Sequence, residues 1–197
     1  TFHALGLKLL QIDHAKVGLK RGFSVFDSDD SLGQLKDLMP GAKGDALQAV
    51  QGLISRAKNT GLSPEQALEV AHSPREREAA QLYARYQQRL TTFNAVDFDD
   101  LLLLAVKLLS EHAAVREKWQ RKFGYLMVDE FQDTNRLQYR WLKLLAGPQS
   151  CMFAVGDDDQ SIYAFRGATT ENMQHFERDF AVEKVIKLEQ NYRSHGN

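Results

Sequence analysis

Two adjacent carboxylates, Asp129 and Glu130, directly follow the apolar run Tyr125–Val128. Four apolar residues are too few for a helix and are typical of a strand buried on both faces of a parallel sheet. In open α/β sheets the ligand site lies beyond the carboxyl ends of the strands, which is where this pair falls. Neighbouring side chains on an extended chain point apart, so one carboxylate can hold a metal ion while the other faces a water molecule.

This division of labour is typical of phosphoryl transfer, in which a metal-binding aspartate lies beside a residue that orients or deprotonates the nucleophile. For two acids alone, a solvated turn that caps the next helix is the better interpretation. The longer string Asp-Glu-Phe-Gln-Asp-Thr-Asn, residues 129–135, favours the chemical interpretation only through its resemblance to a known motif, given below.

A second cluster follows residues 151–155, which predict another buried strand. The glycine after this strand permits a tight exit, and Gln160 can hydrogen-bond both a terminal phosphate and its attacking water. Tyr163, Phe165 and Arg166 then place two aromatic rings and a guanidinium within one short segment. Unpaired bases stack on such groups, although aromatic residues at such positions are more often packing residues.

Three strings resemble consecutive motifs of one protein family. Residues 129–135 closely resemble the second helicase motif of the UvrD/Rep/PcrA family of superfamily 1 DNA helicases. Residues 156–168 resemble the third motif, and residues 188–194 resemble the fourth, in the same order. The resemblance extends over essentially the whole chain, and the texture of residues 96–100 and 186–194 is nearest to the Rep branch.

The resemblance implies roles in ATP hydrolysis for five residues. Asp129 would hold Mg²⁺, and Glu130 would activate the attacking water. Gln160 and Arg193 would sense and stabilise the γ-phosphate, and Tyr192 would pack on the adenine. Arginine suits this task because its rigid fork of donors stabilises charge that spreads over phosphate oxygens. For Arg193 the alternative is a structural salt bridge in a loop that leaves a strand.

The resemblance also implies contacts with single-stranded DNA. The family places such contacts at a short Thr-Phe-His segment, which this chain carries at residues 1–3, and in the third motif. Phe2 could instead be a core residue of the first helix. Phe165 stands where close relatives usually have tryptophan, which reduces the stacking area. The candidate DNA-binding residues are Thr1, Phe2, His3, Tyr163, Phe165 and Arg166.

The spacing of apolar residues predicts the elements that position these groups. Strands and helices alternate after residue 124, with a third strand at residues 184–188, which implies a parallel sheet with right-handed crossovers. The expected fold class is α/β: an incomplete RecA-like (P-loop NTPase) parallel sheet with helices on both faces, plus an all-helical insertion subdomain. The missing strands are expected before Thr1.

The chain divides by pattern into three parts. Residues 1–13 would begin the retained part of the RecA-like motor lobe, residues 14–93 would form the helical insertion, and residues 94–197 would continue the lobe. In the insertion, Ser63 and Ser73 each precede a proline and a capping-box partner, which predicts two helix starts. Likewise, Asp97 with Asp100 suits the N-cap of the next helix, with a metal site of the aspartates at 97, 99 and 100 as the alternative.

Composition limits the function classes further. The 197 residues carry a formal net charge of −1, with 43% hydrophobic and 26% charged residues, as in an ordinary globular protein. Any DNA must therefore be held by a local groove and by stacking, not by overall basicity. The lone cysteine, Cys151, is expected to be buried and indicates a reducing compartment, here the cytoplasm. No apolar run approaches membrane-spanning length, and no signal peptide is visible.

These features predict a fragment of an ATP-dependent DNA helicase that translocates 3′-to-5′ on single-stranded DNA and unwinds duplex in replication or repair. The complete protein would use ATP and Mg²⁺. Its partners would be single-stranded DNA, single-strand/duplex junctions, the remaining motor lobe and replication or repair proteins, with no membrane. The sequence has no Gly-x-x-x-x-Gly-Lys-Ser/Thr loop, so the fragment alone is expected to be inactive. The alternatives are the helicase subunit of an AddA/RecB-type helicase–nuclease and a non-enzymatic single-strand DNA binding or docking module.

Overall fold

The structure is a computed structural model that describes residues 1–157 and 171–186. Short parallel strands accompany a larger set of helices, so the fold is mixed α/β and mostly helical. The strands are β1 (Ser24–Phe26), β2 (Ala95–Asp97), β3 (Tyr125–Val128) and β4 (Cys151–Ala154). The α-helices are α1 (Phe2–Asp13), α2 (Ser28–Leu38), α3 (Gly44–Asn59), α4 (Pro64–Glu69), α5 (Pro74–Thr92), α6 (Phe98–Glu111), α7 (Ala113–Lys122), α8 (Arg136–Leu145) and α9 (Glu171–Asp179).

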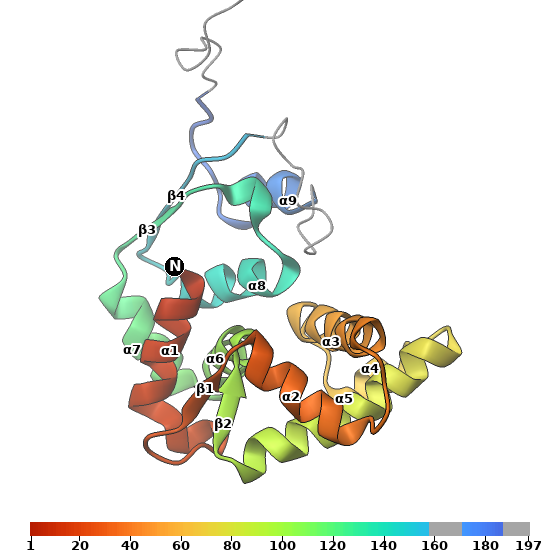
Figure 1. Ribbon diagram of the computed structural model, residues 1–197. Helices are drawn as coiled ribbons and strands as arrows, with labels where there is room; N and C mark the ends of the chain where they lie inside the picture. The colour runs from red at the N-terminus through yellow and green to blue at the C-terminus, as the bar shows by residue number, and fades with distance from the viewer. Residues whose placement is uncertain (158–170, 187–197) are drawn as a thin grey trace, which may run out of the picture.

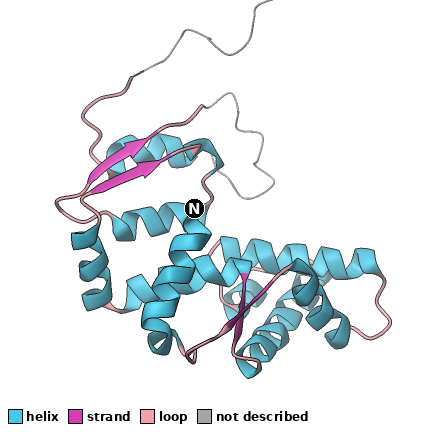
Figure 2. Cartoon of the chain, turned by 60° about the vertical axis from the view of Figure 1, so that its left-hand side comes forward, coloured by secondary structure: helices cyan, strands magenta, loops and turns pink. Residues whose placement is uncertain are grey.

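These elements form an elongated arrangement. Helices α2 to α5 gather at one end of the molecule, and strands β3 and β4 lie with helix α9 at the other (Figure 1). Helices α1, α6 and α8 lie between the two ends, and the same order is visible after rotation (Figure 2). Among the described residues, no helix combines the length and the apolar character needed to cross a membrane.

A small parallel pair joins the segments that flank helices α2 to α5. Strand β1 pairs with β2, with Ser24 opposite Ala95 and Phe26 opposite Asp97. The prediction that residues 14–93 are all helical is therefore wrong at β1. Three residues are too few to show the alternation that identifies a strand, and the partner of β1 lies on the far side of the helical segment.

The helical end has its own core, built from the apolar faces of α2, α3 and α5. Both predicted serine caps are confirmed: Ser63 and Ser73 each accept a hydrogen bond from the backbone N–H three residues on, and each receives the reciprocal capping-box contact. The buried core residues here include Leu35, Val50, Ile54, Tyr83, Tyr86 and Leu90.

Helices α1, α6, α7 and α8 share a second core around two buried tryptophans, Trp119 and Trp141. Helix α1 can approach α6 closely because residue 6 is glycine. A Cβ at Gly6 would lie 2.3 Å from the carbonyl oxygen of Leu101, so the two backbones are in direct contact there. This contact places the start of α1 against the helix that follows β2.

Strands β3 and β4 form the predicted parallel pair, in the register Tyr125 to Cys151 and Val128 to Ala154. Val128, Met152 and Ala154 pack on Tyr139 and Leu142 of α8 and on Phe176 of α9. The opposite face is open among the described residues. The large apolar residues exposed on these strands and just beyond β4 are Tyr125 (81%), Met127 (78%), Phe153 (53%) and Val155 (47%).

Three sequence predictions are therefore wrong for the described chain. β3 is not buried on both faces, and helices do not cover both faces of this sheet. Cys151, predicted to be buried, is exposed. Residues 184–186 form no strand, and Val185 and Ile186 are exposed, whereas residues 187–188 lie outside the described residues. An apolar pattern shows what a strand can bury, but a covering layer must be present to bury it.

Candidate functional site

The acidic pair lies where the sequence places it, at the carboxyl end of β3. Asp129 and Glu130 are both exposed, and Asp129 Oδ1 accepts a hydrogen bond of 2.9 Å from the backbone N–H of Glu130. Glu130 has a φ of 49°, a left-handed conformation that is uncommon outside glycine. The backbone turns sharply at Glu130, which is the N-cap of the short 3₁₀ helix Phe131–Asp133.

Gln132 holds Glu130 in place. Its Nε2 donates a hydrogen bond of 2.6 Å to Glu130 Oε2, and its Oε1 accepts one of 3.0 Å from the backbone N–H of Asp157. Gln132 is itself buried, with 4% of its surface exposed. One amide thus ties the carboxylate after β3 to the loop after β4. No pattern around Gln132 predicted this role, because its two partners are set by tertiary pairing.

The segments that immediately follow β3 and β4 also contact each other through their backbones. The backbone N–H of Phe131 donates to the carbonyl of Val155 at 2.9 Å. Gly156 permits this approach, since a Cβ at that position would lie 3.0 Å from Gln132 Oε1 and 3.4 Å from Phe131 Cβ. The two predicted chemical segments therefore begin side by side, as expected for neighbouring parallel strands.

The residues at this edge fit a magnesium ion only in the manner typical of nucleotide sites. Asp129 offers one carboxylate, and Mg²⁺ commonly takes one or two carboxylates together with water and substrate phosphates. Within residues 1–157 and 171–186, no three His, Cys, Asp or Glu side chains group as a ligand set. The donor set thus suits a metal that arrives with a phosphate ligand, not a closed structural site.

Six predicted site residues lie outside the described residues, so their positions are not part of this geometry. They are Gln160, Tyr163, Phe165, Arg166, Tyr192 and Arg193. The described chain reaches Asp157 at the start of the second chemical string.

The three N-terminal residues occupy different environments. Thr1 caps helix α1 by accepting a hydrogen bond from the N–H of Ala4 at 3.3 Å. Phe2 packs on the core, with its ring centroid 5.7 Å from that of Trp141. His3 lies 5.5 Å from Phe98 between ring centroids, and burial lowers the pKa of His3 although the charge of Asp99 opposes this.

Phe98 was not predicted as a site residue, yet 54% of its surface is exposed beside His3. The signal in the sequence was available: an aromatic residue stands at the first position of a helix whose first turn is otherwise acidic. His3 and Phe98 together form an aromatic surface at the junction of α1 and α6, close to the N-terminal residues predicted to contact DNA.

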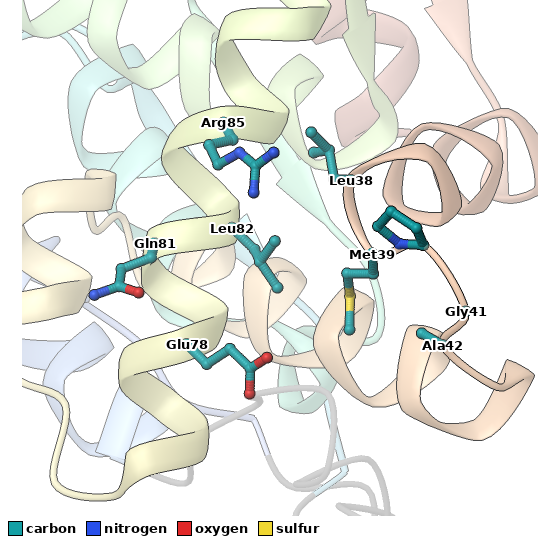
Figure 3. A pocket seen from close by; sticks show the side chains of 9 residues that line it. Leu38, Met39, Gly41, Ala42, Glu78, Gln81, Leu82 and Arg85 are labelled. Atoms are coloured by element: carbon teal, nitrogen blue, oxygen red, sulfur yellow. The ribbon is translucent and has the colours of Figure 1, made fainter.

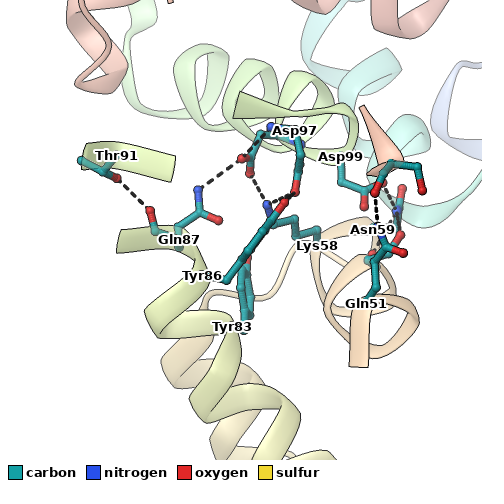
Figure 4. A network of polar contacts seen from close by, with 12 residues as sticks. Gln51, Lys58, Asn59, Tyr83, Tyr86, Gln87, Thr91, Asp97 and Asp99 are labelled. Atoms are coloured by element: carbon teal, nitrogen blue, oxygen red, sulfur yellow. Dashed lines mark hydrogen bonds and ion pairs between the residues drawn. The ribbon is translucent and has the colours of Figure 1, made fainter. Parts of the chain in front are cut away.

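The three aspartates at the start of α6 are engaged in structure and not in a metal site. Asp97 caps α6 with Asp100 as its capping-box partner, as predicted. Lys58, fully buried, donates to Asp97 Oδ2 at 2.7 Å and to Asp100 Oδ1 at 2.8 Å (Figure 4). The hydroxyl of Tyr86 also donates to Asp97 Oδ2, at 2.9 Å. The lysine supplies the positive charge that a metal ion would supply.

Burial and charge act in opposite directions in this cluster. Burial would lower the pKa of Lys58, but the charges of Asp100 and Asp97 and their hydrogen bonds hold that pKa above its usual value. Burial raises the pKa of Asp100 to about 6 although the charge of Lys58 opposes the shift. The cluster joins the end of α3 to the start of α6, and no motif pattern predicted it.

A separate cavity of ≈ 540 Å³ lies at the helical end of the molecule. Figure 3 shows it between Glu78, Leu82 and Arg85 of α5 and the segment around Met39. None of the predicted site residues lines it. The predicted site residues that the structure describes lie elsewhere, at the carboxyl end of β3 and at the start of α1.

Comparison with known proteins agrees with the three strings. The sequence profile described as the UvrD/REP helicase N-terminal domain matches residues 1–181. The chain is 47% identical over 199 residues to the ATP-dependent DNA helicase Rep of Escherichia coli (strain K12), covering 100% of this chain and 30% of that protein. It is 41% identical over 201 residues to DNA helicase II of Haemophilus influenzae, covering 100% of this chain and 27% of that protein. ATP-dependent DNA helicase PcrA of Bacillus subtilis (strain 168) is 40% identical over 198 residues, covering 98% of this chain and 27% of that protein. The chain thus spans less than a third of the length of these relatives.

Proposed function

Because the chain belongs to the UvrD/REP helicase family, we propose that the protein is an ATP-dependent DNA helicase and that this chain supplies part of its first motor lobe. The single observation that carries the proposal is the arrangement at the ends of β3 and β4. There an exposed Asp129 precedes a Glu130 whose carboxylate is held by the buried Gln132. A carboxylate fixed by a second-layer hydrogen bond is suited to orienting one water molecule.

The proposed division of roles follows the family motifs. Asp129 binds Mg²⁺, which supplies charge neutralisation for the phosphates of ATP, and Glu130 takes the proton of the attacking water. Gln160 and Arg193 contact the γ-phosphate, and Tyr192 packs on the adenine. The hydrogen bonds of Gln132 support the role of Glu130 because they fix its carboxylate without neutralising it.

We assign the DNA contacts to Thr1, Phe2, His3, Tyr163, Phe165 and Arg166. The half-buried His3 ring beside the exposed Phe98 supports a contact surface at the start of α1. Phe2 contributes mainly by placing His3, since its own ring packs on Trp141. The substrate would be single-stranded DNA and its junctions with duplex, with 3′-to-5′ translocation, in replication or repair.

The open face of the β3–β4 sheet supports a further part of the proposal. Tyr125, Met127 and Phe153 are large apolar residues exposed on it. We propose that the remaining strands and helices of a RecA-like motor lobe cover this face in the full-length protein. In this proposal residues 1–13 and 94–197 belong to the motor lobe, and residues 14–93 form the insertion. The proposed location of the protein is the cytoplasm, where its DNA lies.

The test uses the full-length protein and two isosteric variants. Glu130→Gln keeps size and hydrogen bonding but cannot take a proton, so kcat for ATP should fall by about 100-fold or more with Mg-ATP affinity nearly unchanged. Asp129→Asn should instead weaken the Mg²⁺-dependent part of nucleotide binding. DNA-stimulated phosphate release and equilibrium Mg-ATP binding are measured for both variants. Equal losses of affinity with unchanged kcat would refute the division of roles.

A further inference from the structure

We propose that Asn59, at the end of α3, is a positioning residue that ties the helical insertion to the loop that carries Asp129 and Glu130. The inference rests on the proposed function and adds a residue that no motif contains. Helix α3 packs on α5 within the insertion and also on α6 and α8.

Asn59 joins three elements through one amide group. Its Nδ2 donates to the carbonyl of Ser55 within α3 at 2.9 Å and to Asp99 Oδ1 in α6 at 2.8 Å. Its Oδ1 accepts a hydrogen bond of 2.8 Å from Nδ2 of Asn135. Figure 4 shows Asn59 and Asp99 beside the Lys58 cluster. Both the amide nitrogen and the amide oxygen of Asn59 are therefore hydrogen-bonded.

The direction of this chain of hydrogen bonds is fixed at both ends. Asp99, as a carboxylate, can only accept, so the amide nitrogen of Asn59 must face it. At the other end, Asn135 Oδ1 accepts from the backbone N–H of Gln138 at 2.8 Å, which caps α8. The nitrogen of Asn135 must therefore face Asn59. A flip of either amide would set two hydrogen-bond acceptors, or two donors, against each other and lose the hydrogen bonds described.

The end of α3 is also held rigidly. The neighbouring Lys58 is buried between Asp97 and Asp100, and breaking such an arrangement leaves uncompensated charge in the interior. A Cβ at Gly61, just beyond α3, would lie 3.6 Å from Leu137 of α8, so the backbone there passes close to α8. The backbone at Asn59 is therefore held in place by contacts with both α6 and α8.

Asn135 links Asn59 to the loop that carries Asp129 and Glu130, because Asn135 is the last residue of that loop before α8. The segment between Glu130 and Asn135 is a short 3₁₀ helix followed directly by the capped start of α8. Thr134 and Asn135 are buried, and Gln132 holds Glu130 from within the same segment. If Asn135 moves, this short and buried segment must move with it, and the position of the Glu130 carboxylate changes.

Two isosteric variants of the full-length protein each remove a different hydrogen bond from the series Asp99–Asn59–Asn135. Asn135→Asp keeps the oxygen that caps α8 but loses the nitrogen that donates to Asn59. Asn59→Asp keeps the oxygen that faces Asn135 but places a carboxylate against Asp99. The control is Thr60→Ala, because the Thr60 hydroxyl donates only to carbonyls of its own helix, Arg56 and Ala57.

Each Asn variant should lower kcat for ATP by about 10- to 100-fold, with KM for ATP changed less than about twofold, since misplaced catalytic groups act on the transition state. Hydrogen exchange of the amides in residues 130–138 should become faster in both variants, while α5 exchanges as in the wild type. Thr60→Ala should match the wild type in all measurements.

The outcomes separate this inference from the proposed function. If the wild-type protein showed no DNA-stimulated ATP hydrolysis, the proposed function would fail, and the exchange of residues 130–138 would still test the tie. If Asn135→Asp kept wild-type kcat, or kept wild-type exchange in that segment, the inference would be overturned. Since Asn135→Asp retains the helix cap, its effect is separable from simple loss of folding.

Discussion

At the scale of single residues, the most consequential side chain outside the acidic pair Asp129–Glu130 is that of Lys58. It is fully buried between two carboxylates, with Tyr86 adding a hydroxyl to Asp97. Its ammonium also lies 5.2 Å from the ring centre of Tyr86. A buried charge is stable only when it is paired and hydrogen-bonded, and here the pairing joins α3 to α6.

Lys58→Met should lower the free energy of unfolding by about 3–5 kcal/mol, since two carboxylates lose their counter-ion in the interior. The loss should depend on pH. Burial already raises the pKa of Asp100 to about 6, and removal of Lys58 should raise it further. Between the unfolded pKa and the folded one the native state binds more protons than the unfolded state, so stability falls as pH rises.

Chemical denaturation at about pH 5 and about pH 8 checks this sign. The difference between the variant and the wild type should be larger at the higher pH. Lys16→Met is the matched control, because Lys16 is partly exposed and pairs only with Asp13, and such pairs contribute about 0–1 kcal/mol. A smaller difference at the higher pH would contradict the electrostatic account of the cluster.

At the scale of elements, the crossing of α1 and α6 depends on a missing side chain. Gly6→Ala would place a methyl group 2.3 Å from the carbonyl oxygen of Leu101, which belongs to the backbone and cannot rotate away. The helices must separate, and overpacking of this kind costs about 1–3 kcal/mol or more. This exceeds the gain of about 1 kcal/mol in helix propensity.

Gly33→Ala in α2 is the matched control, since nothing lies within 4 Å of its Cβ position. It should be neutral or stabilising by up to about 1 kcal/mol. Thermal or chemical unfolding of both variants distinguishes packing from propensity. If Gly6→Ala were as stable as Gly33→Ala, the close crossing of α1 and α6 would not be the native arrangement.

At the scale of the whole molecule, the 197 residues contain only part of what ATP hydrolysis requires. They carry the proposed metal ligand and general base but no Gly-x-x-x-x-Gly-Lys-Ser/Thr sequence to hold the phosphates. The isolated chain should therefore show no DNA-stimulated release of phosphate, because the charge that develops on the γ-phosphate is not compensated. The full-length protein, assayed in parallel, is the positive control. Turnover by the purified chain that disappears in Glu130→Gln would overturn this expectation.

Sequence alone was sufficient to identify the family, the order of the chemical strings and three of the helix starts. These features are local: Ser63, Ser73 and Asp97 cap their helices through contacts only three residues away, and β3 follows from four adjacent apolar residues. The left-handed turn at Glu130 and the bridge by Gln132 were not predicted, because Gln132 meets Asp157 only once β3 and β4 are paired.

Which groups meet across the chain, and which faces are covered, depends on tertiary packing. In the sequence, Lys58 resembles any lysine of a helix, and its buried ion pairs form only when α3 packs on α6. Asn59 likewise finds its partner Asn135 in a segment 76 positions away. Cys151 and Tyr125 have the apolar context of buried residues, yet both are exposed because helices pack on only one face of the described sheet. Local sequence specifies an element and what it can bury, whereas burial itself requires a partner surface whose position depends on the whole fold.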